Sequence, residues 1–199
     1  FFGREGQSED VLRKLKQNRF VTVIGASGSG KSSLIYCGVI PRLADTEGED
    51  IKNWQVINMR PGNDPLGNLT TVLSSKIISE QQKDIDRTII ETVLKKDDKG
   101  LVKAVSNLKS NGSKRILLLV DQFEEVFRYK TAAGAGAVQG DANYFVNLLV
   151  NAVKDSRSGI SVIITMRSDY IGDCAHFQGL TELINNSNYL VPHMGEDNY

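Results

Sequence analysis

The sequence predicts an α/β fold in which a parallel sheet alternates with helices. Short apolar runs of strand length recur along the chain, and they are nearly continuous in apolar character, as expected for strands buried on both faces of a parallel sheet. Helical patterns lie between these runs, which indicates βαβ units with right-handed crossovers. The expected strands are residues 20–24, 55–59, 116–120, 160–165 and, more weakly, 189–191.

Apolar residues at helical spacing predict the helices. Their buried faces are expected to consist of Val11, Leu12 and Leu15; of Leu69, Leu73 and Ile77; and of Phe145, Leu148, Leu149, Ala152 and Val153. Residues 76–108 hold two helical patterns and no strand pattern. The glycine- and alanine-rich segment 131–141 is predicted to be a mobile loop.

Composition excludes several classes of protein. The 199 residues suit one α/β domain with a sizeable core, and 24 acidic side chains balance 24 basic ones, which argues against a dedicated nucleic-acid binder. No apolar run approaches the ~18 residues that a membrane span needs. Cys37 and Cys174 make no disulfide framework, which fits a reducing cytosol and predicts a cytoplasmic location. The chain begins without a methionine or a signal-peptide pattern, so we expect a piece of a longer protein.

The stretch "VTVIGASGSGKSS", residues 21–33, places a loop of glycines and serines directly after the first expected strand. Residues 25–32 match G-x-x-x-x-G-K-[ST] at every fixed position, and a helix is expected from about Lys31. Glycines let backbone N–H groups approach phosphate oxygens, and the helix N-terminus adds its dipole. We therefore expect Lys31 to reach the β- and γ-phosphates and Ser32 to ligate Mg²⁺.

This match favours a nucleoside triphosphate over an accidental turn of glycines and serines. A dinucleotide-binding fingerprint fails, because Ser33 stands where a third glycine is needed. The predicted nucleotide-binding residues of the loop are Gly25, Ala26, Ser27, Gly28, Ser29, Gly30, Lys31, Ser32 and Ser33.

Acidic residues follow the aliphatic run in "RILLLVDQFEE". Asp121, at the end of the expected strand, is predicted to help hold the magnesium, although an acid there can also cap a helix. Glu124 and Glu125 come next, and a carboxylate at this place can orient or deprotonate the attacking water. Alternatively, both begin the next helix, where the helix dipole favours carboxylates. The pattern favours a functional role for Glu124 and leaves both interpretations open for Glu125.

Arg167 ends another expected strand, in "SVIITMRSD". Ligands bind at the carboxyl ends of strands in open α/β sheets, so Arg167 is predicted to sense γ-phosphate charge; the alternative is a surface ion pair with Asp169. No Asn-Lys-x-Asp motif for guanine occurs in the sequence, which favours ATP over GTP. In "RPGNDP", Asp64 is expected to cap a helix that begins at Pro65, and the role of Arg60 stays open.

Six segments together resemble a known family: "FFGRE", "GASGSGKSSL", "RPGNDP", "DQFEEVF", "ITMRSDY" and "YLVPHM", in this order. They resemble the novel STAND NTPases, which are signal-transduction ATPases related to the apoptotic, NB-ARC and NACHT switches. The resemblance covers essentially the whole chain. It implies a P-loop NTPase fold of the ASCE type, with a sheet of order 5-1-4-3-2 and helices on both faces. The Arg167 strand is then inserted between the strands that lead to Lys31 and Asp121.

The resemblance also assigns residues. Gly3, Arg4 and Glu5 match the segment that lies against the adenine and ribose. Lys31 and Ser32 match the phosphate-loop residues, Asp121 the magnesium acid, Glu124 and Glu125 the second acidic pair of related NACHT proteins, and Arg167 the sensor arginine. Family members continue into a helical lid and sensor repeats, whereas this sequence stops at Tyr199; we expect residues 1–199 to be the NTPase core alone.

Two functions of different classes follow. The first is a regulatory switch in a signalling or defence protein, in which ATP and ADP stabilise different domain arrangements and Mg²⁺-dependent hydrolysis is slow. Its expected partners are the nucleotide, other domains of the same protein and further copies of the chain on activation. The second is a self-sufficient ATPase or phosphotransferase with continuous turnover. We read no acceptor-binding signature in the sequence, and the resemblance favours the switch.

Overall fold

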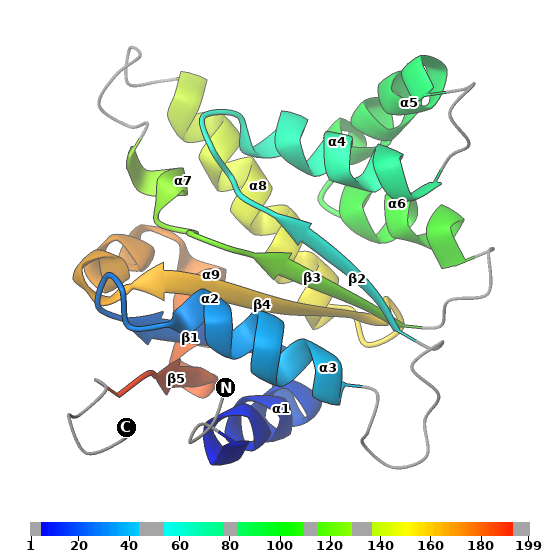
Figure 1. Ribbon diagram of the computed structural model, residues 1–199. Helices are drawn as coiled ribbons and strands as arrows, with labels where there is room; N and C mark the ends of the chain where they lie inside the picture. The colour runs from blue at the N-terminus through cyan, green and yellow to red at the C-terminus, as the bar shows by residue number, and fades with distance from the viewer. Residues whose placement is uncertain (1–4, 44–53, 78–82, 110–114, 129–136, 193–199) are drawn as a thin grey trace.

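A five-stranded, all-parallel sheet forms the centre of the molecule, in the order β2-β3-β4-β1-β5 (Figure 1). A computed structural model describes residues 5–43, 54–77, 83–109, 115–128 and 137–192. The observed order is the predicted order 5-1-4-3-2 read from the other edge, so the predicted fold is confirmed. The strands are β1 Phe20–Gly25, β2 Trp54–Met59, β3 Arg115–Val120, β4 Ile160–Arg167 and β5 Asn188–Leu190, each within two residues of its predicted bounds.

The register of the sheet determines which side chains meet at its carboxyl edge. β4 lies between β1 and β3, pairing Gly25 with Arg167 on one side and Val120 with Ile164 on the other. Asp121, the residue after β3, therefore comes level with Thr165, and Gly25, the last residue of β1, comes level with Arg167 at the end of β4. Three strand ends far apart in sequence thus converge.

Helices cover both faces of the sheet, as Figure 1 shows. They are α1 Glu5–Asn18, α2 Lys31–Ser33, α3 Ile40–Arg42, α4 Pro65–Ile77, α5 Lys83–Lys96, α6 Gly100–Lys109, α7 Glu125–Arg128, α8 Ala137–Lys154 and α9 Gln178–Asn186. A π-helical segment, Leu34–Val39, joins α2 to α3, and a 3₁₀-helical segment, Ser168–His176, follows β4. Residues 83–109 contain two helices and no strand, as predicted.

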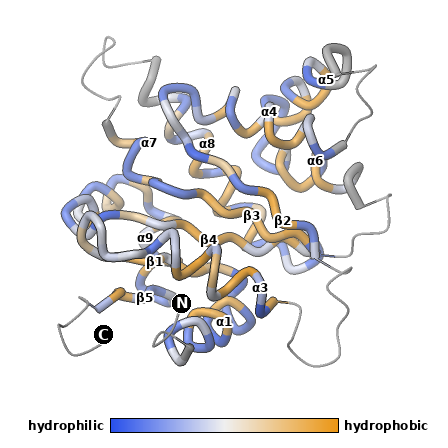
Figure 2. Tube along the Cα trace, viewed as in Figure 1, coloured by the Kyte–Doolittle hydropathy of each residue, from blue (hydrophilic) through white to orange (hydrophobic). Residues whose placement is uncertain are grey.

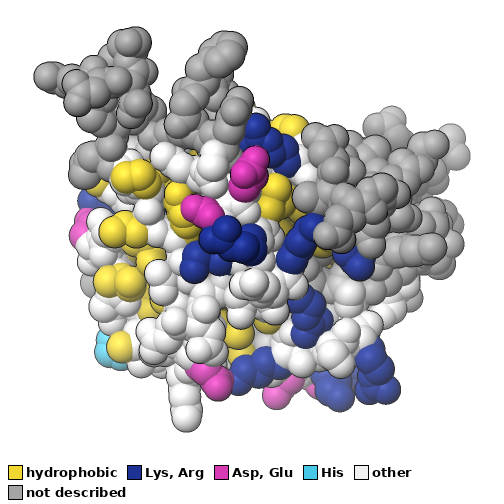
Figure 3. Space-filling model, turned by 90° about the horizontal axis from the view of Figure 1, so that it is seen from below, with side chains coloured by type: hydrophobic (Ala, Val, Ile, Leu, Met, Phe, Trp, Pro, Cys, Tyr) yellow, Lys and Arg dark blue, Asp and Glu magenta, His cyan; other side chains and the backbone are white. Residues whose placement is uncertain are grey.

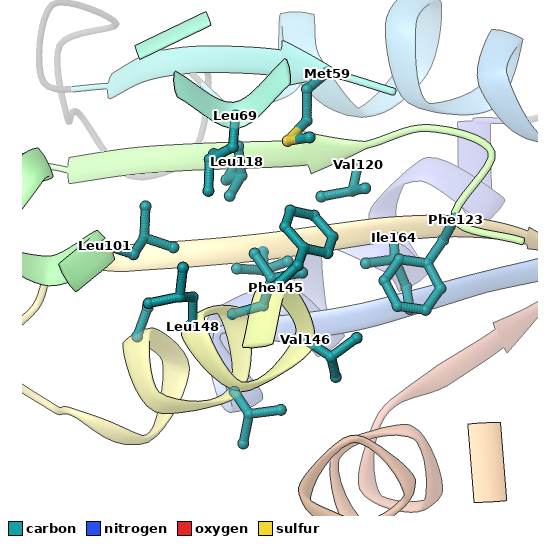
Figure 4. Packing of buried hydrophobic residues seen from close by; sticks show 14 of the residues in the cluster. Met59, Leu69, Leu101, Leu118, Val120, Phe123, Phe145, Val146, Leu148 and Ile164 are labelled. Carbon is teal, nitrogen blue, oxygen red and sulfur yellow. The ribbon is translucent and has the colours of Figure 1, made fainter. Parts of the chain in front are cut away.

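Alternate residues of the strands point into two separate cores. On one face, the strands pack against α4, α6, α8 and α9; Figure 4 shows Phe145 of α8 beside the strands that carry Leu118, Val120 and Ile164. On the other face, Val21, Val23, Leu117, Leu119 and Ile163 pack against α1 and the helical run 31–42. Figure 2 shows hydrophobic residues concentrated along the strands, which explains their nearly continuous apolar character.

The predicted helix faces are buried where the structure describes them. This holds for Val11, Leu12 and Leu15 of α1, for Leu69 and Leu73 of α4, and for Phe145, Leu148, Leu149, Ala152 and Val153 of α8. The side chain of Ile77 lies outside the described residues. Near "RPGNDP", α4 begins at Pro65, and Asp64 Oδ1 accepts a hydrogen bond of 2.9 Å from Gly67 N, which is the predicted cap.

The loop prediction for residues 131–141 is wrong over its second part. α8 begins at Ala137, so residues 137–141 are helical, and residues 131–136 lie outside the described residues. Alanine is the strongest helix former, and glycine costs a helix only about 1 kcal/mol relative to it. Gly140 is exposed with open space where a Cβ would stand, so this residue weakens the first turns of the helix without preventing them. Composition alone overstated the tendency to form a loop.

The surface carries charges of both signs. On the face seen in Figure 3, Lys and Arg side chains are dispersed, and Asp and Glu side chains lie next to several of them. This mixture of signs agrees with the formal net charge of +0. No helix in the described part of the chain is both long and apolar enough to cross a membrane.

Candidate functional site

The loop after β1 has the backbone shape of an anion-binding nest. Gly28 and Gly30 have φ angles of 76° and 81°, in the left-handed region that glycine adopts without a steric penalty. Gly30 lies immediately before α2, and Leu34 N donates to Gly30 O at 2.8 Å, so the helix grows directly out of the loop. Successive backbone N–H groups in such a turn point inward and bind phosphate oxygens.

Lys31 lies across this loop. Its Nζ donates hydrogen bonds to the backbone carbonyls of Gly25 at 2.9 Å and Ala26 at 2.7 Å. An ammonium group has three N–H donors, so these two bonds leave a third for a phosphate oxygen. Partial burial lowers the pKa of Lys31, and the nearby carboxylate of Glu124 opposes this shift. The ammonium is thus held over the loop next to an acidic partner.

Asp121 follows β3 directly and joins three parts of the chain. Its side chain is 1% exposed. Oδ1 accepts hydrogen bonds from Ser32 Oγ at 2.9 Å and from Thr165 Oγ1 at 2.6 Å, while Oδ2 lies 3.3 Å from Nη2 of Arg60. Ser32 and Asp121, both predicted from the sequence as magnesium residues, are therefore in direct contact although 89 positions separate them.

Thr165 was missed in the sequence analysis. It lies in β4, and besides its bond to Asp121 its Oγ1 accepts a hydrogen bond of 3.0 Å from Gln122 N. Its backbone carbonyl accepts from Phe123 N at 2.9 Å, so the turn after β3 is fastened to β4. Gln122 has a φ of 56° in this turn. The available signal was a hydroxyl side chain near the end of a buried aliphatic run, two residues before Arg167.

The donors near the loop fit a magnesium ion. Mg²⁺ prefers oxygen ligands, and in phosphate-binding sites it is held by one or two protein oxygens together with the phosphates and water. The Ser32 hydroxyl and the Asp121 carboxylate, 2.9 Å apart, supply such a pair. The Thr165 hydroxyl orients the carboxylate by donating a hydrogen bond to it. A buried carboxylate is stabilised by positive charge beside it, so this pair of oxygens could hold a cation.

The two neighbouring glutamates have different surroundings. Glu124 is 7% exposed and faces the loop, and its Oε2 lies 3.4 Å from the backbone N of Arg167. Glu125 begins α7, and its Oε2 accepts a hydrogen bond of 2.9 Å from Gly62 N in the "RPGNDP" turn. This geometry supports the helix-start interpretation of Glu125 and leaves Glu124 as the acid that faces the phosphate loop.

Arg167 makes the surface ion pair that the sequence analysis gave as the alternative. Its Nε and Nη2 donate to Asp169 at 3.1 and 2.5 Å, and its guanidinium carbon lies 5.4 Å from the ring centroid of Tyr170. The hydrogen bond to Asp169 raises the pKa of Arg167 further, so the side chain stays charged. Its role as a phosphate sensor stays a prediction.

Among the described residues, a polar pocket of about 330 Å³ collects most of the predicted site. It is lined by Ser27, Gly28, Gly30, Lys31, Ser32, Ser33, Asp121, Gln122, Glu124, Thr165 and Arg167, and Glu125 is not one of them. A cavity of about 440 Å³ lies elsewhere, at the amino ends of β2 and β3, but Leu12, Leu15 and Trp54 contribute to its lining. The chemistry of the lining, rather than size, identifies the smaller pocket as the candidate site.

The expected adenine contact lies largely outside the described residues. Gly3 and Arg4 are not described, and Glu5 is described only as the first residue of α1, without its side chain. Their assignment to the adenine and ribose stays a prediction.

The parallel sheet with β4 inserted between β1 and β3, and the phosphate loop that joins β1 to α2, define a P-loop nucleoside triphosphatase fold. Within this class, the chain belongs to the family described as Novel STAND NTPase 1, which matches residues 1–199. The resemblance drawn from the sequence is therefore confirmed.

Individual proteins similar to this chain include an ATP-binding protein and a protein of solved structure. A phosphate import ATP-binding protein, PstB, from Campylobacter jejuni is 32% identical over 68 residues, which is 30% of this chain and 28% of that protein. The structure of the Aeropyrum pernix ORC2 protein, in ADPNP-ADP complexes, matches with a TM-score of 0.59 and 15% identity, over 96% of this chain and 48% of that one. This chain thus spans less than half of either relative, and the ORC2 likeness shows the fold alone.

We predict that Thr165→Val destabilises the protein by about 1–3 kcal/mol, because it removes one of the two hydroxyl hydrogen bonds to Asp121 Oδ1 and the hydrogen bond from Gln122 N. Urea unfolding measures the free energy of unfolding. Thr92→Val is the matched control: the Thr92 hydroxyl is exposed and donates within α5 to Thr88 O, so the change should stay within about 0.5 kcal/mol. Equal stability of the two variants would show that Thr165 does not hold the site together.

Proposed function

We propose that this chain binds ATP together with Mg²⁺ and hydrolyses it slowly, as the nucleotide-dependent switch of a larger signalling or defence protein. One observation carries the proposal: the hydrogen bond of 2.9 Å between Ser32 of the phosphate loop and the buried carboxylate of Asp121. It brings the two oxygen donors that a magnesium–triphosphate complex needs to one point. Membership of the STAND family supports the same function.

Phosphate binding is assigned to the loop and Lys31. The glycine-shaped loop offers its backbone N–H groups to the phosphates, and Lys31 contributes a positive charge beside them. The carbonyls of Gly25 and Ala26 orient the ammonium, so little conformational freedom remains to be lost on binding. We infer adenine as the base, and Gly3, Arg4 and Glu5 as its contacts, from the family pattern.

Ser32 and Asp121 would hold the magnesium, and Thr165 positions the carboxylate. The metal, when bound, neutralises charge that develops on the phosphate oxygens. Glu124 is the residue best situated to take the proton of the attacking water, because it is buried beside the loop and faces the same pocket as Lys31. Glu125 acts at a distance, by holding the turn at Gly62.

Arg167 has two possible partners in the proposed site, Asp169 and the γ-phosphate of the nucleotide. Arg167 lines the pocket, and its guanidinium donates two hydrogen bonds to Asp169. A γ-phosphate would compete with Asp169 for this guanidinium, and we infer that it draws the side chain away from Asp169. Such an exchange couples the chemical state of the nucleotide to the 3₁₀ segment Ser168–His176, which supports a switch over a continuously turning enzyme.

The cellular context belongs to the proposal as well. We infer that the nucleotide state is read by other domains of the same protein and that further copies of the chain join on activation. We propose a cytoplasmic location, which the cysteine content supports.

Turnover separates the switch from a self-sufficient ATPase or phosphotransferase. We expect hydrolysis by the purified protein, with Mg²⁺ and no partner, on the order of 10⁻³ s⁻¹ or slower, the range of switch NTPases that lack an activating partner. Single-turnover assays with radiolabelled ATP measure the rate. Steady-state turnover above about 1 s⁻¹ would favour the second function.

Glu124→Gln should slow hydrolysis by ~10²-fold or more while ATP binding is kept, because an amide cannot accept the proton of the attacking water. Binding is measured by calorimetry and hydrolysis by the same single-turnover assay. Glu125→Gln is the matched comparison, since glutamine can still accept the hydrogen bond from Gly62 N, and its loss should be far smaller. A larger loss in the Glu125 variant would reverse the assignment of the two acids.

A further inference from the structure

Arg60 reaches the metal-binding carboxylate from outside the phosphate pocket. It follows β2 directly, and its Nη2 lies 3.3 Å from Asp121 Oδ2, whereas the hydroxyls of Ser32 and Thr165 donate to Oδ1. The Arg60 side chain is 60% exposed and Asp121 is 1% exposed. One buried carboxylate thus has hydroxyl donors on one oxygen and a surface cation on the other.

The backbone that carries Arg60 is firmly anchored, while the guanidinium is not. Gly62 N donates to Glu125 Oε2 at 2.9 Å, and Asn68 Nδ2 donates to Pro61 O at 2.8 Å. The Arg60–Asp121 contact, by contrast, is a single one at 3.3 Å, longer than the ~2.7–2.9 Å of a strong charge-assisted hydrogen bond. The guanidinium of Arg167, by comparison, is held by two hydrogen bonds to Asp169. The backbone at Arg60 is therefore fixed by hydrogen bonds, while its guanidinium is held by one long contact.

Arg60 and a magnesium ion would compete for the same negative charge. A buried carboxylate must be compensated, and the guanidinium supplies the compensating positive charge on Oδ2. A divalent cation at Asp121 and Ser32 would compensate the carboxylate more strongly and would repel a guanidinium a few ångströms away. The two cations are therefore alternative partners of Asp121.

We propose that Arg60 is a displaceable counter-ion of Asp121, which neutralises the carboxylate until Mg²⁺ bound with the nucleotide takes over and the guanidinium moves away. This inference rests on the proposed binding of a magnesium–nucleotide complex. It assigns a role to Arg60, whose function the sequence left open. This role is distinct from phosphate contact, because Arg60 is not among the described residues that line the phosphate pocket.

A polar cavity beside Arg60 could receive its side chain after displacement from Asp121. A cavity of about 430 Å³ adjoins Arg60, and Tyr36, Asn58, Asn68 and Thr71 contribute polar groups to its lining. Tyr36 belongs to the π-helical segment that continues the phosphate-loop helix, an irregularity that is frequent at functional sites. Displacement of Arg60 would thus move a positive charge toward a surface formed by β2, α4 and the segment after the phosphate loop.

The test compares Arg60→Gln with the wild-type protein and with Arg13→Gln, in which a surface arginine loses its pairing with Asp10. The Mg²⁺ concentration that half-saturates the complex with a non-hydrolysable ATP analogue is measured by fluorescence of a labelled nucleotide. We expect this concentration to fall about fivefold in Arg60→Gln, the factor of an ion pair at the strong end of the exposed range, and to stay unchanged in Arg13→Gln.

A second readout needs neither nucleotide nor metal. Without both, Arg60→Gln should lower the Tm by roughly 2–4 °C, because Asp121 loses its cation. In an Asp121→Asn background the same substitution should leave the Tm unchanged, since the pair no longer exists. A Tm loss of equal size in both backgrounds would overturn the proposal.

The outcomes separate this inference from the proposed function. If the wild-type protein binds the analogue but Arg60→Gln leaves the Mg²⁺ requirement unchanged, the counter-ion role is wrong and the proposed function stands. If Arg60→Gln weakens the triphosphate analogue but not ADP, Arg60 is a γ-phosphate contact instead. If the wild-type protein binds no nucleotide, both proposals fail.

Discussion

Asp121 places a carboxylate at the end of β3 with almost no access to water, and burial of such a charge costs several kcal/mol unless it is compensated. The compensation comes from three directions: Ser32 from the phosphate loop, Thr165 from β4 and Arg60 from the end of β2. The carboxylate therefore ties the ends of separate strands to one point. The order of the sheet makes this possible, because β4 lies between the strands that lead to Ser32 and Asp121.

Much of the fold was predictable because its signals are local. Strands buried on both faces read as unbroken aliphatic runs, and the phosphate loop is defined by residues at fixed spacing. The π-helical segment Leu34–Val39 and the start of α8 at Ala137 were not predicted. Both lie in sequences that suit more than one backbone conformation, so packing decides between them.

The site was predictable as a set of residues but not as a set of contacts. Thr165 acts on Asp121 only because the register of β3 and β4 brings them level, which no local pattern encodes. Adjacent carboxylates look alike in sequence, yet the turn at Gln122 directs Glu124 to the phosphate loop and Glu125 to Gly62. Glu124 therefore lines the pocket, whereas Glu125 holds the neighbouring turn at Gly62.

The central claim is that Asp121 links the phosphate loop to the metal. Calorimetric titration of a non-hydrolysable ATP analogue, with and without Mg²⁺, tests it in the wild-type protein and in Asp121→Asn. Asparagine can still accept the bonds from Ser32 and Thr165 but carries no charge to anchor the ion. We predict that the variant binds the analogue without Mg²⁺ about as well as the wild type and loses most of the gain in affinity that Mg²⁺ brings. An equal gain in both proteins would contradict the account.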